Sequence, residues 1–166
     1  TDGTTGCSST GTAGDITVNP SPTVNVPAGD DEICVGETVN ITPNSGGTWS
    51  SSDPSVATIT NGGVVDGISA GTATMTFTDG TTGCSSTGTA GDITVNPSPT
   101  VNIPAGDDEI CVGETVNITP NSGGTWSSSD PSVATITNGG VVDGISAGTA
   151  TMTFTDGTTG CSSTGT

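Results

Sequence analysis

The sequence predicts an all-β protein made of tandem β-sandwiches, and three observations support this. The chain is a 77-residue unit written twice with an overlap, since the segment Thr1–Thr12 recurs at Thr78 and at Thr155. Short runs rich in Val, Ile, Thr and Ala alternate with clusters of Gly, Pro, Asn, Asp and Ser, a pattern typical of strands joined by turns. Signals for helices are missing.

The repetition also limits what the chain can do. Residues 13–89 and 90–166 differ only at Val26, which is Ile103 in the second copy. Two copies this similar cannot carry two different specialised sites, so the output of the array is length, valency or both. We expect three segments, and the sequence begins and ends within the pattern, as part of a longer array would. The segments are 1–19, the C-terminal strands of a preceding repeat; 20–96, the first repeat; and 97–166, the second repeat without its closing strand.

Three strands are expected in the first half of each unit. Thr23–Val26 follows a Pro-Ser-Pro stretch and is predicted to be an edge strand, because proline is tolerated at sheet edges. Glu37–Thr42 alternates apolar and polar residues, as a half-buried strand does. Gly47–Ser50 carries the single tryptophan of the unit and is predicted to be the third strand.

Four more strands are expected in the second half. Val56–Thr60 and Val64–Val65 flank two glycines and predict a tight hairpin. In Gly71–Thr78 the apolar residues point to one face and the threonines to the other. Asp92–Asn96 is the predicted closing strand, with its earlier copy at 15–19. About seven short strands in 77 residues fit an immunoglobulin-like sandwich.

The cysteines and the tryptophan support the same fold. In immunoglobulin-type domains a cysteine on an early strand bonds to one on a late strand, and a tryptophan packs on the bridge. The predicted core aromatic residues are Trp49, Phe77, Trp126 and Phe154. The predicted disulfides are Cys34–Cys84 and Cys111–Cys161, which leaves Cys7 unpaired. Two alternatives stay open, namely buried free thiols and the bonds Cys7–Cys34 and Cys84–Cys111, which would join neighbouring units.

The segments Gly47–Ile59 and Gly63–Met75 resemble the bacterial immunoglobulin-like group 2 domain. They carry its Trp-Ser-Ser-Ser, Ser-Val-Ala, Gly-Val-Val-x-Gly and Ala-Gly-Thr-Ala-Thr elements in order. The resemblance implies a β-sandwich stalk module of bacterial surface proteins, as in intimin- and invasin-like adhesins. A second resemblance is to repeats in giant secreted surface proteins of gliding Bacteroidetes, which implies a place outside the cell and a link to gliding motility. It is carried by Ile33–Gly36, Gly46–Trp49 and Gly83–Ser85.

The charge excludes several classes of function. The chain has no Lys, Arg or His and has 17 Asp and Glu residues, for a net charge of -17. Without cations it cannot neutralise the phosphates of nucleic acid or an anionic membrane surface. Without histidine or lysine no serine or threonine has an activating base, so an enzyme is not expected. No apolar run approaches the ~18–20 residues of a membrane span.

An acidic loop precedes the first cysteine of each unit. Clustered carboxylates offer the hard oxygen ligands that calcium prefers, and such a site near a domain junction could stiffen it. There is no EF-hand spacing, so a solvated acidic loop is favoured and calcium is the alternative; no other cofactor is expected. Threonine-rich strand faces are found in ice-binding surfaces, but ordinary β propensity explains them better here. The acidic residues are Asp30, Asp31, Glu32, Asp107, Asp108 and Glu109.

We therefore expect an extracellular stalk or filament module of a bacterial cell-surface adhesin. Short Pro-Ser-Pro linkers at 20–22 and 97–99 are conformationally restricted, so the units should form an extended rod. The expected partners are the neighbouring identical repeats. The alternative is a repeated binding module, for glycan, for calcium, or for self-association into a fibre by donation of the strand at 15–19.

Overall fold

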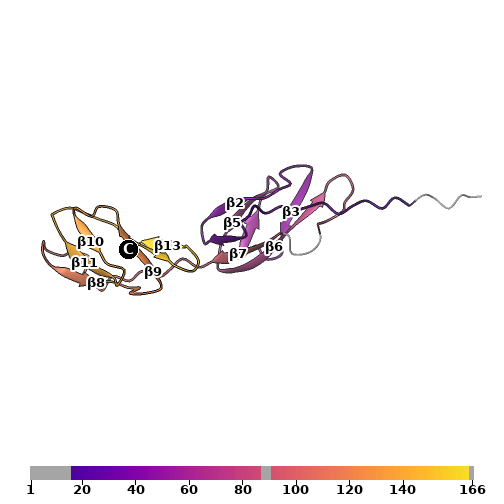
Figure 1. Cartoon of the computed structure of the whole chain (residues 1–166). Helices are drawn as coiled ribbons and strands as arrows, with labels where there is room; N and C mark the ends of the chain where they lie inside the picture. The colour runs from indigo at the N-terminus through magenta and orange to yellow at the C-terminus, as the bar shows by residue number, and fades with distance from the viewer. Residues whose placement is uncertain (1–15, 87–90, 165–166) are drawn as a thin grey trace, which may run out of the picture.

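The computed structural model describes residues 16–86 and 91–164, and its strands form two β-sandwich units (Figure 1). All the regular elements in these ranges are strands, β1 to β13, which confirms the all-β prediction. None of the described residues belongs to a helix long and apolar enough to cross a membrane. Cys7 and most of the expected segment 1–19 lie outside the described residues. We refer to 20–96 as unit 1 and to 97–166 as unit 2.

Unit 1 contains a four-stranded and a three-stranded sheet. The larger sheet has the order β1-β7-β6-β3, in which β1 runs parallel to β7 and the other pairs are antiparallel. Its strands are β1 (Glu32–Cys34), β3 (Gly47–Ser51), β6 (Gly71–Asp79) and β7 (Asp92–Asn96). The smaller sheet has the order β2-β5-β4, with β2 (Thr38–Asn40), β4 (Ala57–Ile59) and β5 (Val64–Gly67).

Unit 2 repeats most of this arrangement with three strands in each sheet. The sheets have the orders β13-β12-β9 and β10-β11-β8. The strands are β8 (Thr115–Asn117), β9 (Gly124–Ser128), β10 (Ala134–Ile136), β11 (Val141–Gly144), β12 (Met152–Asp156) and β13 (Ser162–Thr164). Within residues 97–164, no strand occupies the places that β1 and β7 hold in unit 1.

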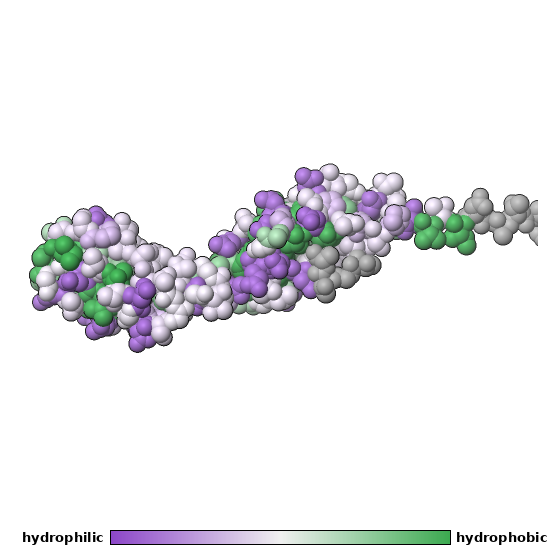
Figure 2. Space-filling view, viewed as in Figure 1, coloured by the Kyte–Doolittle hydropathy of each residue, from purple (hydrophilic) through white to green (hydrophobic). Residues whose placement is uncertain are grey.

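The core of each unit lies between its two sheets and contains the predicted aromatic residues. In β6, Ala73, Met75 and Phe77 are buried, while the threonines between them point outward. The Trp49 ring meets the Phe77 ring edge-on at a centroid distance of 5.1 Å, and its indole N–H donates to the Pro43 carbonyl at 2.8 Å. Trp126 and Phe154 repeat this packing. On the face shown in Figure 2, hydrophilic residues and residues of intermediate hydropathy cover much of the surface, with hydrophobic patches among them.

Three strand predictions were wrong. Residues 23–26 form a single bridge, between Asn25 and Thr42, instead of an edge strand. The strand β1 was missed, because its carboxylates suggested a loop and because its partner β7 lies some 60 residues away in the sequence. Ile33, which is 3% exposed, anchors β1 in the core. The strand expected at 15–19 is also not found, since its described residues 16–19 form no strand. The other strands expected in unit 1 are present, with ends that differ by at most two residues.

Gly47 of β3 lies very close to the backbone and core side chains of β6. A Cβ atom at this position would lie 2.1 Å from the Thr78 carbonyl oxygen and 2.5 Å from Cζ of Phe77. We expect Gly47→Ala combined with Gly124→Ala to lower the free energy of unfolding of each unit by about 1–3 kcal/mol, because the core must shift to admit the methyl group. Urea unfolding followed by tryptophan fluorescence would measure this.

The matched control is Gly62→Ala combined with Gly139→Ala. A Cβ at these turn glycines meets only a threonine hydroxyl, at 3.7 Å, so stability should change by less than about 0.5 kcal/mol. If both double variants lost the same free energy of unfolding, the close contacts around Gly47 would not be the reason why this position requires glycine.

Candidate functional site

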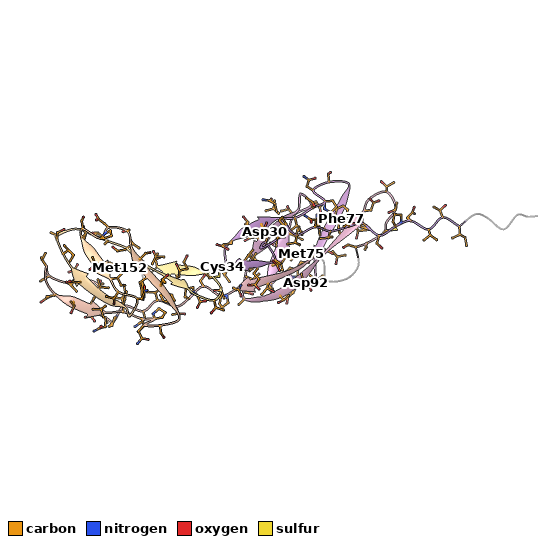
Figure 3. The ribbon with its side chains drawn as sticks, viewed as in Figure 1. Asp30, Cys34, Met75, Phe77, Asp92 and Met152 are labelled. Atoms are coloured by element: carbon orange, nitrogen blue, oxygen red, sulfur yellow. A yellow bond between two sulfur atoms is a disulfide. The ribbon has the colours of Figure 1, made fainter. Side chains whose placement is uncertain are left out.

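One disulfide joins the two units. Cys34 of unit 1 is bonded to Cys161 of unit 2, across 127 residues of sequence and with a Cα–Cα distance of 5.6 Å. Figure 3 shows Cys34 at the end of unit 1 that faces unit 2. The units are thus connected twice, by the backbone at 97–99 and by this bond.

The strand β1 places Cys34 at the junction. Cys34 ends β1 and lies opposite Asn96, the last residue of β7, and the Val35 N–H donates to the Asn96 carbonyl at 3.0 Å. Since Ile33 points into the core, the alternation of the strand turns Cys34 away from it. The linker at 97–99 begins directly after Asn96. Cys34 therefore lies where the chain leaves unit 1.

A turn at the end of β12 places Cys161. The Asp156 carboxylate accepts hydrogen bonds from the N–H groups of Thr158 and Thr159, both at 2.9 Å. The Asp156 N–H in turn donates to the Cys161 carbonyl at 2.8 Å, which closes the turn. Cys161 is fully buried.

The predicted pairing within each unit, Cys34–Cys84 and Cys111–Cys161, is wrong. In unit 1 the two cysteines lie near opposite ends of β6. Cys34 lies opposite Asn96 of β7, and the preceding residue of β7, Val95, pairs with Gly71 at the start of β6. The Cys84 carbonyl accepts the N–H of Asp79, the last residue of β6. Nine residues of strand span about 25 Å, whereas a disulfide needs Cα atoms about 4.4–6.8 Å apart.

The two remaining described cysteines, Cys84 and Cys111, are free thiols. The alternative pairing Cys84–Cys111 is therefore also absent within the chain, and Cys34 is bonded to Cys161 and not to Cys7. The bond does join neighbouring units, as that alternative supposed, but through different cysteines. The tryptophans stack on phenylalanine instead of on a sulfur bridge.

A signal in the sequence could have revealed this. Cys34 directly follows Ile33, and in a strand two adjacent side chains point to opposite faces. Only one of them can face the core, and the larger apolar side chain is the better candidate. An outward cysteine cannot form the bridge through the core that the immunoglobulin pattern requires.

Two aspartates in each unit stabilise turns. Hydrogen bonds from the Thr82 N–H, the Thr82 hydroxyl and the Thr81 N–H lower the pKa of Asp79, in the turn before Cys84. The pKa of Asp156 is lowered in the same way, by the N–H groups of Thr159 and Thr158. At Asp53 the hydroxyl and N–H of Ser55 lower the pKa, and Asp130 is the equivalent residue in unit 2.

The carboxylates of the acidic loops do not gather into one cluster among the described residues, and calcium binding stays a prediction. In the part of the chain that the structure describes, no three acidic, Cys or His side chains come close enough to share a metal ion. The carboxylate of Glu37, in the turn after β1, accepts the Cys34 N–H at 3.0 Å, and that of Glu114 accepts the Cys111 N–H at 3.1 Å. The residues concerned are Asp30, Asp31, Glu32, Asp107, Asp108 and Glu109.

Three of the outward threonines of β6 form side-chain hydrogen bonds with neighbouring segments of the sheet. The hydroxyl of Thr74 donates to the Asp92 carboxylate, that of Thr72 lies 3.4 Å from the Thr94 hydroxyl, and that of Thr78 lies 2.9 Å from the Ser85 hydroxyl. These bonds link β6 to the segments beside it and are ordinary cross-strand contacts of a sheet.

Comparison with known proteins agrees with this architecture. The family model of the bacterial Ig-like domain (group 2) matches residues 14–90 and 92–166. The chain belongs to this family. The two matched segments cover nearly all of the sequence, one for each repeat.

Individual relatives cover the chain less completely. Ice-binding protein 1 of Shewanella frigidimarina (strain NCIMB 400) is 32% identical over 133 residues, which are 74% of this chain and 14% of that protein. The chain thus spans about a seventh of that relative's length. Among solved structures, the S-layer protein SbsC matches 73% of this chain and 20% of its own at 22% identity and a TM-score of 0.30. Its domains 4 and 5 match at 20% identity and a TM-score of 0.29, over 73% of this chain and 70% of their own.

We expect peptide mapping of the oxidised chain under non-reducing conditions to find Cys34 linked to Cys161. A protease that cleaves at acidic residues is needed, because the chain contains no Lys or Arg. In the Cys161→Ser variant Cys34 should become a free thiol that iodoacetamide labels, because Cys84 lies too far away to replace the lost partner. A peptide containing Cys34 bonded to Cys84 would contradict the structure.

The turn aspartates should make stability depend on pH. Because the pKa of Asp79 and of Asp156 is lower in the folded protein than the usual 3.8, each stabilises the fold above that pH, and this contribution is lost as the pH falls through the folded value. The variant with Asp79→Asn and Asp156→Asn should be less stable than the parent at pH 6, and the difference should shrink toward pH 3. Thermal unfolding across this range would measure it.

The control for this series is Asp31→Asn combined with Asp108→Asn, two exposed aspartates of the acidic loops. It removes the same number of negative charges without touching the turns. If its stability difference from the parent followed the same pH dependence, net charge and not the turn geometry would account for the effect.

Proposed function

We propose that this chain is a structural spacer of a bacterial surface protein, in which disulfides between successive repeats hold an extended stalk together. The observation that carries the proposal is the bond between Cys34 of one repeat and Cys161 of the next. Since the repeats are nearly identical, the same bond can form at every junction of a longer array.

The chemistry supports a place outside the cell. Disulfides persist in oxidising environments and are rare in the cytosol, where thiols are kept reduced. Membership of the bacterial Ig-like domain family is consistent with a surface location. The proposed role is structural, since the chain has no histidine or lysine to activate a serine or threonine nucleophile.

The bond gives mechanical strength to the junction. A linker alone allows two domains to swing and twist about one point, whereas a second covalent connection removes much of that freedom. The bond also shortens the covalent path along which a pulling force is transmitted. When the ends of the chain are pulled, force passes from Cys34 directly to Cys161, so the 126 residues between them carry none of it.

The charge suits a spacer that has to stay separate from its neighbours. With a net charge of -17 and no cations, two chains lying side by side repel each other. At physiological salt this repulsion acts over a Debye length of about 8 Å, so it opposes lateral contact while leaving the core of each unit almost unaffected.

Pulling single molecules by their ends tests the proposal. The oxidised chain should reach a contour length about 460 Å shorter than the reduced chain, because the 127 residues spanned by the bond extend by at most ~3.6 Å each. The Cys34→Ser variant should behave like the reduced chain without any reductant.

The matched control is Cys84→Ser combined with Cys111→Ser, which removes the free thiols and keeps the bond. It should extend like the oxidised parent. If the Cys34→Ser variant showed the same short contour length as the parent, the bond would not carry the tension and the stapled stalk would be rejected. Antibodies against the chain should also label intact cells that produce it, and failure to do so would rule out the surface location alone.

A further inference from the structure

We propose that small thiols attack the junction disulfide at Cys34 and not at Cys161, and that the Cys161 thiolate then restores the bond unless the junction is under tension. This assigns a modification site, the S-thiolation of Cys34, which the spacer role does not require. Its mechanical consequence rests on the proposed spacer function. Three features carry it: a difference in burial, two carboxylates beside Cys34, and contacts that hold Cys161 in place.

The two cysteines of the bond differ in their access to solvent. Cys34 is half-buried on the outward face of β1, whereas Cys161 is 0% exposed. The turn around Cys161 does not bury it alone, because the equivalent turn of unit 1 leaves Cys84 partly exposed. The end of unit 1 therefore helps to cover Cys161. An attacking thiolate has to reach a sulfur directly, so access selects Cys34.

The reaction is a thiol–disulfide exchange. The thiolate of a small thiol forms a bond to the Cys34 sulfur, the Cys34–Cys161 bond breaks, and its electron pair leaves with the Cys161 sulfur. The products are a mixed disulfide on Cys34 and a thiolate on Cys161. Full reduction needs a second small thiol, which attacks the mixed disulfide, releases Cys34 as a thiol and forms the disulfide of the small thiol.

Two carboxylates beside Cys34 select among small thiols. Glu37 accepts the Cys34 N–H at 3.0 Å, and Glu32 stands two residues before Cys34 on the same face of β1, roughly 7 Å away along the strand. The chain has no Lys, Arg or His to offset these charges. An anionic thiol is therefore repelled from Cys34 and a cationic one is attracted. The expected reagents are small neutral or cationic thiols.

Contacts that do not involve the bond hold Cys161 in its turn. Its N–H donates to the Thr159 hydroxyl at 3.3 Å, and its carbonyl accepts the Asp156 N–H at 2.8 Å. Cys84, which is a free thiol, makes the same two contacts in the equivalent turn of unit 1. The turn therefore does not depend on the bond, and Cys161 should keep its place when the bond opens.

The thiolate of Cys161 also stays close to Cys34. The Cys84 sulfur lies 3.9 Å from the Asn19 carbonyl oxygen, although no bond ties it there. Asn19 is the equivalent of Asn96, which lies opposite Cys34. A free Cys161 beside Asn96 can therefore attack the Cys34 sulfur of the mixed disulfide and expel the small thiol.

Tension decides whether the opened bond closes again. Reclosure is intramolecular, so its effective concentration is high while the junction is relaxed and falls when a pulling force separates the two sulfurs. A relaxed junction should therefore repair itself, whereas a loaded junction should stay open and release the residues between the two cysteines. The bond then acts as a thiol-sensitive limit on the length of the stalk.

Trapping the mixed disulfide tests the site of attack. The other cysteines are first removed by Cys7→Ser, Cys84→Ser and Cys111→Ser, and the oxidised chain is treated briefly with cysteamine and then with N-ethylmaleimide. Peptide mapping should find cysteamine on Cys34 and N-ethylmaleimide on Cys161, in at least about tenfold excess over the reverse arrangement. Equal amounts of the two arrangements would overturn the proposal.

The same chain in concentrated urea is the control for the fold. Both sulfurs are then accessible, so the two arrangements should form in similar amounts. If the excess on Cys34 persisted in urea, the local sequence and not the burial of Cys161 would select the site, and the structural argument would fail.

A charge series tests the role of the carboxylates. At equal thiolate concentration, the rate of opening should fall from cysteamine to β-mercaptoethanol to mercaptoethanesulfonate. Glu32→Gln combined with Glu37→Gln should reduce the ratio of the first rate to the last by about threefold or more. The control is Glu109→Gln combined with Glu114→Gln, the equivalent residues beside Cys111, which should leave the ratio unchanged. Equal reductions would mean that the charge of the whole chain sets the selectivity, against the proposal.

Single-molecule pulling of the variant that keeps only Cys34 and Cys161 tests reclosure. After β-mercaptoethanol has opened the bond under force, the thiol is washed out and the force is removed. The next pull should show the short contour length again, and N-ethylmaleimide added before relaxation should prevent this by blocking Cys161. A chain that stays long without N-ethylmaleimide would refute reclosure by Cys161. The spacer role is judged separately, from the contour length before any thiol is added.

Discussion

The central position of β7 determines both the fold of a repeat and the way it connects to the next. β7 lies between β1 and β6 and brings two apolar side chains, Ile93 and Val95, into the core. It is also the last strand before the linker at 97–99. The ordering of β7 therefore also orders the junction between the units. The strand β1 places Cys34 beside the start of the linker only when β1 is paired with β7.

Unit 2 allows the effect of this strand to be seen within a single molecule. The two units have almost the same sequence, yet the residues equivalent to β1 and to the start of β6 form no strand in unit 2. Local sequence thus does not determine these strands. A parallel pair such as β1 and β7 joins segments about 60 residues apart, so the pairing forms only when the partner is present.

The disulfide belongs to the junction and not to the core. In immunoglobulin domains the bridge crosses between the two sheets and stabilises one domain. Here each core is closed by tryptophan packed on phenylalanine, and the bond links one domain to the next. A cross-link in this place resists bending and pulling of an array. The negative charge acts together with it, since like-charged chains repel each other when they lie side by side.

Several properties follow from the sequence alone. The nearly exact repeat and the alternation of apolar residues in Gly71–Thr78 are sufficient to predict an all-β tandem array. The aromatic core was predictable because Trp49 and Phe77 are the only large rings in the unit. Periodicity and composition are local properties, and these conclusions depend on nothing else.

The tertiary structure decided which cysteines meet. The spacing of Cys34 and Cys84 matched a familiar domain, but their positions at opposite ends of β6 keep them about 25 Å apart, and the partner of Cys34 comes from the next repeat. The absence of strands at 109–111 and 148–151 of unit 2 was likewise visible only in the tertiary structure. Both features depend on how a strand far along the chain is placed, because distance in the sequence does not determine distance in space.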